Sequence, residues 1–258
     1  MTPFPDYKEI HMERSFFEWI IYLIQEYWPY FVQGALLTLA IAFWGTVLGY
    51  VLGFLMGIVQ STPNPKEGFF LKRWFLIILK AVCKIFVEVF RCTPMMVQAM
   101  VIYFGLKQFG EGLTPFMAAV LVTLLNTGAY MAETVRGGII SIDKGQLEGA
   151  KALGMSHFTT MFSVILPQAF RNIFPEMVNQ YLTNLKMTSV LNVIGVAELY
   201  FVTKTAAGTY YRYFEAYVIC GLIYLVLCLF FTRLFALLEK KLAGRNDYEL
   251  AAEYMDAE

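Results

Sequence analysis

Long runs of apolar residues constrain this sequence more than any other feature. The segment from Ala216 to about Leu238 contains the run VICGLIYLVLCLFF, and a second segment, from Pro29 to about Val59, carries no charged residue. About 20 apolar residues suffice for a helix to cross a hydrocarbon core of about 30 Å. Because 58% of the residues are hydrophobic and the mean hydropathy is +0.56, we expect an all-α integral membrane protein with one membrane domain.

The apolar pattern predicts about five transmembrane helices. The expected spans are 29 to 59, 94 to 109, 116 to 134, 172 to 201 and 216 to 238, the fourth interrupted near Lys186 and Gly195. A further helix from Trp74 to Arg91 carries Lys80, Lys84 and Glu88 four residues apart. Charges on a lipid-facing helix are unfavourable. We therefore expect this helix to lie at the cytoplasmic interface.

Four glycines recur every fourth residue in the first span: Gly45, Gly49, Gly53 and Gly57. Residues at this spacing share one face of a helix. That face either lines a pore or packs closely against a neighbouring helix. Close packing is the more frequent use of such a pattern, and we expect it here.

The distribution of Lys and Arg predicts the orientation. Basic residues concentrate in the loops after the first, third and fifth spans, and cytoplasmic loops carry an excess of them. The N-terminus should lie outside the cell and the C-terminus in the cytoplasm. Residues 1–28 are expected to be an extracytoplasmic or interfacial flank, 29–244 the transmembrane domain, and 245–258 a cytoplasmic acidic tail.

Several classes of function are disfavoured by the sequence. The formal net charge of +0 argues against a nucleic-acid partner. The four cysteines lack metal-binding spacing, so we expect neither a metal nor a disulfide. There is no GxxxxGK[ST] phosphate loop, HExxH or GxSxG motif. We expect no catalytic residue, no cofactor in this chain and no enzyme activity of its own.

A polar segment from Ala132 to Pro167 separates two apolar spans. Asp143 can cap a helix, Gln146 follows three residues later, and Gly154 is suited to a helix C-terminus. The pattern predicts a short amphipathic helix from Lys144 to Leu153, outside the membrane.

The same segment contains Glu148-Gly149-Ala150, then Gly154, then Leu166-Pro167. Four more blocks flank it in order: VEVFRCTPMMVQ (87–98), LNTGAYMAETVRGGI (125–139), LPQAFRNIFPEMVNQ (166–180) and KMTS (186–189). Together these blocks resemble the permease subunits of ATP-binding-cassette amino-acid importers, in the polar amino-acid uptake (histidine and glutamine permease) family. The resemblance covers about Pro29 to Gly244, with Gly149 replacing the usual alanine of the EAA loop.

The resemblance implies a type I importer permease fold in the cell membrane and the transport of a polar amino acid. It implies that ATP and Mg are bound by separate ATPase subunits, that a second permease copy or paralogue completes the pathway, and that an extracytoplasmic solute-binding protein delivers substrate. The residues expected to couple to the ATPase are Gly145, Gln146, Glu148, Gly149, Ala150, Leu153 and Gly154. An ion-coupled secondary amino-acid carrier is the alternative, although no internal inverted repeat is visible.

Polar residues at membrane depth are the candidates for substrate contact. They are Asn126, Tyr130 and Glu133, at helical spacing in the third span, and Lys186, Thr188 and Ser189 in the fourth. Glu133 could receive the ammonium group of an amino acid, and Lys186 with the hydroxyls its carboxylate. Alternatively, Glu133 forms an ion pair that holds the fold. Met187 stands where the family often has aspartate, which favours a neutral or acidic amino acid as substrate.

Overall fold

The computed structural model describes residues 14–63, 70–110 and 112–242, and these residues form helices and the loops between them. The elements are α2 (Phe16–Ser61), α3 (Phe70–Cys92), α4 (Met95–Gln108), α5 (Pro115–Ile140), α6 (Lys144–Ala152), α7 (His157–Thr160), the π-helix η1 (Met161–Ile165), α8 (Leu166–Met187), the 3-10 helix η2 (Thr188–Ile194), α9 (Leu199–Tyr210) and α10 (Tyr213–Leu242). Residues 1–13 of the expected flank and the expected acidic tail, 245–258, lie outside the described residues.

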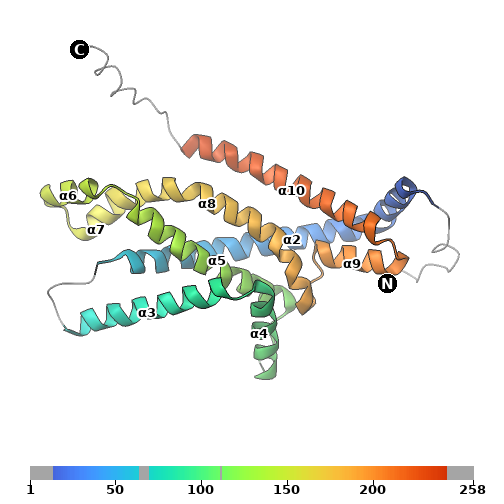
Figure 1. Ribbon diagram of the computed structural model, residues 1–258, viewed down its shortest axis with the longest axis horizontal. Helices are drawn as coiled ribbons and strands as arrows, with labels where there is room; N and C mark the ends of the chain where they lie inside the picture. Colours follow the sequence, from blue (N-terminus) through green and yellow to red (C-terminus); the bar gives the residue numbers. More distant parts are fainter. Residues whose placement is uncertain (1–13, 64–69, 111, 243–258) are drawn as a thin grey trace, which may run out of the picture.

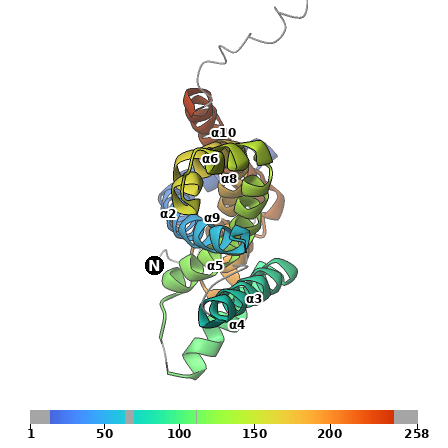
Figure 2. The same cartoon turned by 90° about the vertical axis from the view of Figure 1, so that its left-hand side faces the viewer.

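Five long helices, α2, α3, α5, α8 and α10, extend along the long axis of the molecule, and α4 turns across it (Figure 1). By length and composition, α2, α5 and α10 could each cross a membrane, and 157–194 with α9 forms a fourth candidate, bent by 57°. The short helices α6 and α7 lie at one end of the bundle, while the first turns of α2 and α9 lie at the other (Figures 1 and 2). The all-helical membrane fold expected from the sequence is thus observed.

The first membrane helix begins earlier than the sequence predicts. We expected its start at Pro29, where the run without charged residues begins, but α2 begins at Phe16 and contains Pro29 in its interior. Ser15 caps it: its backbone N–H donates to the Glu18 carboxylate over 2.7 Å. The turns of α2 before Pro29 are stabilised because Trp19 and Leu23 are fully buried in a hydrophobic cluster with residues of α9 and α10. Tertiary packing therefore outweighs the hydrogen bond that Pro29 removes.

The four-residue glycine repeat packs α2 tightly against α5. A Cβ atom added at Gly45, Gly49, Gly53 or Gly57 would lie 2.4 to 2.6 Å from the Cβ atoms of Thr123, Thr127, Met131 and Val135, respectively. The space left by the missing side chain of each glycine is therefore filled by one side chain of α5, at successive turns of both helices. The close-packing interpretation of the repeat is confirmed, and a pore-lining role for this face is excluded.

The structure corrects the second of two predictions for residues 74–109. We expected an interfacial helix followed by a span from Pro94 to about Phe109. Instead α4, which spans 14 residues, is about 21 Å long, shorter than the hydrocarbon core. The 23 residues of α3 reach about 35 Å, but α3 is not among the described helices that are apolar enough to cross a membrane. The side chains of Lys84 and Glu88 form an exposed ion pair, with 3.7 Å between Nζ and Oε1, and the interfacial position of this helix stays a prediction.

The interruptions expected in the fourth span are present. α8 ends at Met187, the chain continues as the 3-10 helix η2, and Gly195 adopts a left-handed conformation with φ of 82° before α9 begins. Such a φ is readily adopted by glycine because it lacks a Cβ atom. The third and fifth spans are observed as α5 and α10, each a few residues longer than predicted.

Candidate functional site

The expected helix outside the membrane is observed as α6, from Lys144 to Ala152. The Asp143 carboxylate accepts a hydrogen bond of 2.6 Å from the Gly145 backbone N–H and so caps its first turn. Gly154, with φ of 76°, follows its last turn. Capping and termination therefore follow the sequence signals that predicted them.

Most of α6 is exposed. Gly145, Gln146, Glu148 and Gly149 are exposed, and Ala150 is the buried residue of the helix. A side chain added at Gly149 would meet nothing within 4 Å. The helix is thus attached to the bundle by one face and leaves the Gly149 face open.

Exposed apolar side chains enlarge this surface, at the predicted residue Leu153 and at two residues that were not predicted. Leu153 is 84% exposed, Phe158 is 70% exposed, and Phe162 lies beside Phe158 with 4.4 Å between ring centroids. The sequence analysis did not select the two phenylalanines. Their spacing of four in a polar segment was the available signal. We call Gly149, Leu153, Phe158 and Phe162, together with the exposed residues of α6, the α6 surface.

A pocket of about 510 Å³ lies where α3, α4, α5 and α8 meet. It is lined by Arg91, Cys92, Thr93, Pro94, Met95, Asn126, Tyr130, Gln180, Thr183, Asn184 and Met187. We call it the central pocket. Two of the six predicted substrate contacts, Asn126 and Tyr130, line it, and the other four do not. The lining contains one cation, several amides and hydroxyls, and no carboxylate.

Buried amides tie the walls of the central pocket together. Asn184 Nδ2 donates to the hydroxyls of Thr46 (2.7 Å) and Thr127 (2.8 Å), and so joins α8 to α2 and α5. Asn126 Nδ2 donates to Gln98 Oε1 over 3.1 Å and joins α5 to α4. Buried amides with satisfied hydrogen bonds fix one arrangement of helices. Gln98 and Asn184 were not predicted as site residues, although each interrupts an otherwise apolar helix face.

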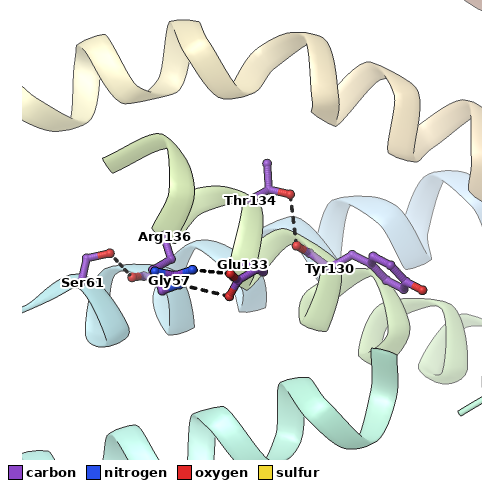
Figure 3. Close-up of polar contacts among 6 residues, drawn as sticks. All are labelled: Gly57, Ser61, Tyr130, Glu133, Thr134 and Arg136. Carbon is purple, nitrogen blue, oxygen red and sulfur yellow. Dashed lines mark hydrogen bonds and ion pairs between the residues drawn. The ribbon is translucent and has the colours of Figure 1, made fainter. Parts of the chain in front are cut away.

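Glu133 forms an ion pair within its own helix. Arg136 Nε donates to Glu133 Oε2 over 3.1 Å, and a second, shorter contact joins Arg136 NH2 to Glu133 Oε1. Figure 3 shows both side chains together, with the Tyr130 ring directed away from them. Of the two alternatives for Glu133, the intramolecular ion pair is the one present in the structure.

The predicted substrate contacts in the fourth span do not line the central pocket. Two of them donate hydrogen bonds to backbone carbonyls, and the third is exposed. The Thr188 hydroxyl donates to the Leu185 carbonyl (3.0 Å) and the Ser189 hydroxyl to the Lys186 carbonyl (2.8 Å). Lys186 itself is exposed on α8. The structure therefore does not bring Glu133 and Lys186 together around one pocket.

The exposed face of α8 is polar along its length. Asn172, Glu176, Asn179, Thr183 and Lys186 are all exposed and fall within one arc of about 80° at 100° per residue. A polar helix face at membrane depth is unfavourable against lipid and usually faces water or protein. We call this face the polar face of α8. It borders the central pocket at Thr183.

Comparisons with known proteins agree with this architecture. The family model described as "Binding-protein-dependent transport system inner membrane component" matches residues 67–244. The arginine transport system permease protein ArtQ of Bacillus subtilis is 37% identical over 220 residues, covering 84% of this chain and 94% of ArtQ. The glutamine transport system permease protein GlnP of Escherichia coli K12 is 36% identical, covering 83% of this chain and 93% of GlnP.

Solved structures are similar along most of the chain. A crystal structure of an amino acid ABC transporter with histidines contains a chain that is 34% identical, with a TM-score of 0.76, covering 89% of this chain and all of that one. An inward-facing MetNI methionine ABC transporter is 18% identical with a TM-score of 0.66 and shares the fold.

Proposed function

The chain belongs to the family of binding-protein-dependent transport system inner membrane components, and from that premise we propose that it is the permease subunit of an ABC importer that carries a polar amino acid into the cell. The observation that carries the proposal is the extent of the match to amino-acid permeases: ArtQ and GlnP each align along more than nine-tenths of their length. No observation favours the ion-coupled carrier.

ATP hydrolysis is assigned to partner subunits, which bind ATP and Mg. The α6 surface supports this assignment, because a short exposed helix with an open glycine and uncovered apolar side chains suits docking to another protein. ATP-driven closure of the two ATPases would move α6, and with it the membrane helices attached through η1 and α8. To the predicted coupling residues we add Phe158 and Phe162. The predicted set is Gly145, Gln146, Glu148, Gly149, Ala150, Leu153 and Gly154, of which Ala150 is buried against the bundle.

A second permease copy or a paralogue would cover the polar face of α8. Two such faces around a common axis would enclose a polar pathway, which resolves the unfavourable exposure of Asn179 and Lys186 to lipid. An external solute-binding protein would deliver the amino acid to this pathway. The central pocket, with Asn126 and Tyr130, opens beside it and is our candidate for substrate contact.

The proposed orientation places the N-terminus outside and the C-terminus in the cytoplasm. Its support is the positive-inside pattern: Lys144 and Lys151 lie on or beside α6, at the bundle end to which we assign the ATPases. The flank 1–28, the membrane domain 29–244 and the acidic tail 245–258 remain our proposed divisions. In the structure, helix α2 crosses the first of these boundaries.

Neutral or acidic amino acids are the proposed substrates. The central pocket offers Arg91 and amide groups, and its lining has no carboxylate to pair with a cationic side chain. Met187, which occupies the position where the family often has aspartate, is part of that lining. L-Glutamine fits this description better than L-arginine.

Reconstitution tests the proposal. The chain, its ATPase and its binding protein are placed in proteoliposomes, and uptake of radiolabelled L-glutamine, L-glutamate, L-histidine and L-arginine is measured with ATP, and with a proton or sodium gradient but no ATP. We expect ATP-dependent uptake of at least one of the first three and none by the permease alone. Uptake driven by an ion gradient without ATP would refute the importer, and efficient uptake of L-arginine would refute the substrate preference.

A further inference from the structure

The junction of α3 and α4 forms one wall of the central pocket. Arg91 and Cys92 end α3, Pro94 precedes the first turn of α4, and all three line the pocket with Thr93 and Met95. The carbonyl end of one helix and the N–H end of another thus meet at a single place. Helix ends carry opposite partial charges, negative at the carbonyl end and positive at the N–H end.

The negative end is already satisfied by side chains. The Phe90 carbonyl accepts hydrogen bonds from Gln98 Nε2 (2.9 Å) and Asn126 Nδ2 (3.3 Å). The Val89 carbonyl accepts from the Thr93 hydroxyl over 2.6 Å. Gln98 Nε2 also donates to the Thr93 carbonyl (2.9 Å). These carbonyls therefore repel an incoming anion less than free ones would.

The positive end is open. Pro94 supplies no side-chain cap to α4, so the first N–H groups of this 14-residue helix lack the usual acceptor. Arg91 lines the same pocket as Pro94 and Met95, and no ion pair of Arg91 occurs among the described residues. Its guanidinium carbon is 5.5 Å from the centre of the Tyr130 ring. The nearby carboxylate of Glu133 is already paired with Arg136.

We infer that Arg91 and the N-terminus of α4 form an anion subsite in the central pocket, which binds the α-carboxylate of the transported amino acid. Guanidinium groups bind carboxylates through two parallel hydrogen bonds, and free N–H groups at a helix N-terminus bind anions. The inference rests on the proposed function and assigns to Arg91 the role that the sequence suggested for Lys186. It leaves the other polar side chains of the lining, among them the exposed Thr183, to face the rest of the substrate.

Cys92 provides a native reporter of this subsite, because it is exposed and lines the same pocket. In the permease–ATPase complex in nanodiscs, the reaction rates of Cys92 with an anionic reagent, 2-sulfonatoethyl methanethiosulfonate, and a cationic one, its 2-trimethylammonioethyl analogue, are measured by mass spectrometry. We expect Arg91→Gln to lower the anionic-to-cationic rate ratio by about threefold or more. The control Lys84→Gln removes a positive charge from the same helix outside the pocket and should change the ratio less than twofold.

Protection of Cys92 from labelling by amino acids and their decarboxylated analogues then tests whether the subsite binds the α-carboxylate. L-Glutamine should slow labelling of Cys92 on the order of tenfold better than its decarboxylated analogue, 4-aminobutanamide, and L-histidine better than histamine. Arg91→Gln should abolish these differences. An unchanged rate ratio, equal protection by acid and amine, or no protection in a complex that takes up these amino acids would overturn the role of Arg91 while the importer assignment stands. Failure of the reconstituted complex to take up any amino acid would instead overturn the proposed function.

Discussion

A single methyl group at Gly53 would disrupt the contact between α2 and α5. Its carbon would lie 2.4 Å from the Cβ atom of Met131, so we expect Gly53→Ala to separate the helices locally and destabilise the protein by about 1–3 kcal/mol. Thermal denaturation in detergent, followed by size-exclusion fluorescence, measures the loss. Gly221→Ala is the matched control, because a Cβ atom there meets nothing within 4 Å. An equal stability of the two variants would contradict the packing.

The Glu133–Arg136 ion pair can be distinguished from a substrate-binding role by removing both charges. Glu133→Gln leaves the Arg136 charge unpaired on a helix near the membrane boundary, and Arg136→Gln leaves the Glu133 charge unpaired, which is unfavourable in both cases. The double variant has neither charge. We therefore expect each single variant to lose uptake and membrane expression, and the double variant to regain most of both.

Uptake assays with expression controls measure this pattern. A substrate ligand at Glu133 predicts the opposite result, in which the double variant is as inactive as Glu133→Gln. Fully normal uptake by Glu133→Gln alone would exclude both roles.

Helix α6 exposes most of its surface, and the open side of Gly149 contacts nothing within this chain. A side chain at Gly149 has room within the chain, so Gly149→Arg should leave folding intact but block a partner that docks against this glycine. We expect co-purification of the ATPase to fall about tenfold, with the thermal stability of the permease unchanged. Gly208→Arg places the same side chain at an equally open glycine on α9, at the other end of the bundle. Equal co-purification of both variants would argue against docking on α6.

The sequence predicted the elements whose signals are local. Asp143 and Gly154 mark the ends of α6, and Gly195 marks the turn between η2 and α9, because capping groups and a left-handed glycine act within a few residues. The extension of α2 before Pro29 was missed, since it depends on burial of Trp19 against distant helices. The interfacial position of α3, predicted from its stripe of Lys84 and Glu88, stays a prediction.

The substrate contacts were predicted less well for a related reason. The apolar pattern of the sequence shows which polar residues lie at membrane depth, but it does not show which of them have hydrogen-bond or ion-pair partners within the chain. Glu133 pairs with Arg136, and Ser189 donates to a backbone carbonyl. Arg91 belonged to a quoted motif, and its place in a pocket with Asn126 became visible only when four helices were assembled.

For the whole molecule, the decisive question is what the polar face of α8 contacts. If it encloses a pathway with a second permease, water should reach it, whereas the apolar surface of α10 faces lipid. Asn179→Cys introduces a thiol on the polar face, and Leu222→Cys introduces one at a 55% exposed apolar position of α10. In the assembled transporter in nanodiscs, a charged methanethiosulfonate should modify Asn179→Cys at least tenfold faster, since the reactive thiolate forms in water.

Mass spectrometry at each introduced cysteine separates this signal from the four native ones. Adding ATP and binding protein should change the rate at Asn179→Cys, because alternating access exposes the pathway to opposite sides in turn, and should leave Leu222→Cys unchanged. If Leu222→Cys reacted faster, the polar face would lie against protein or lipid and α10 would border water. The pathway would then have to be assigned to a different surface of the bundle.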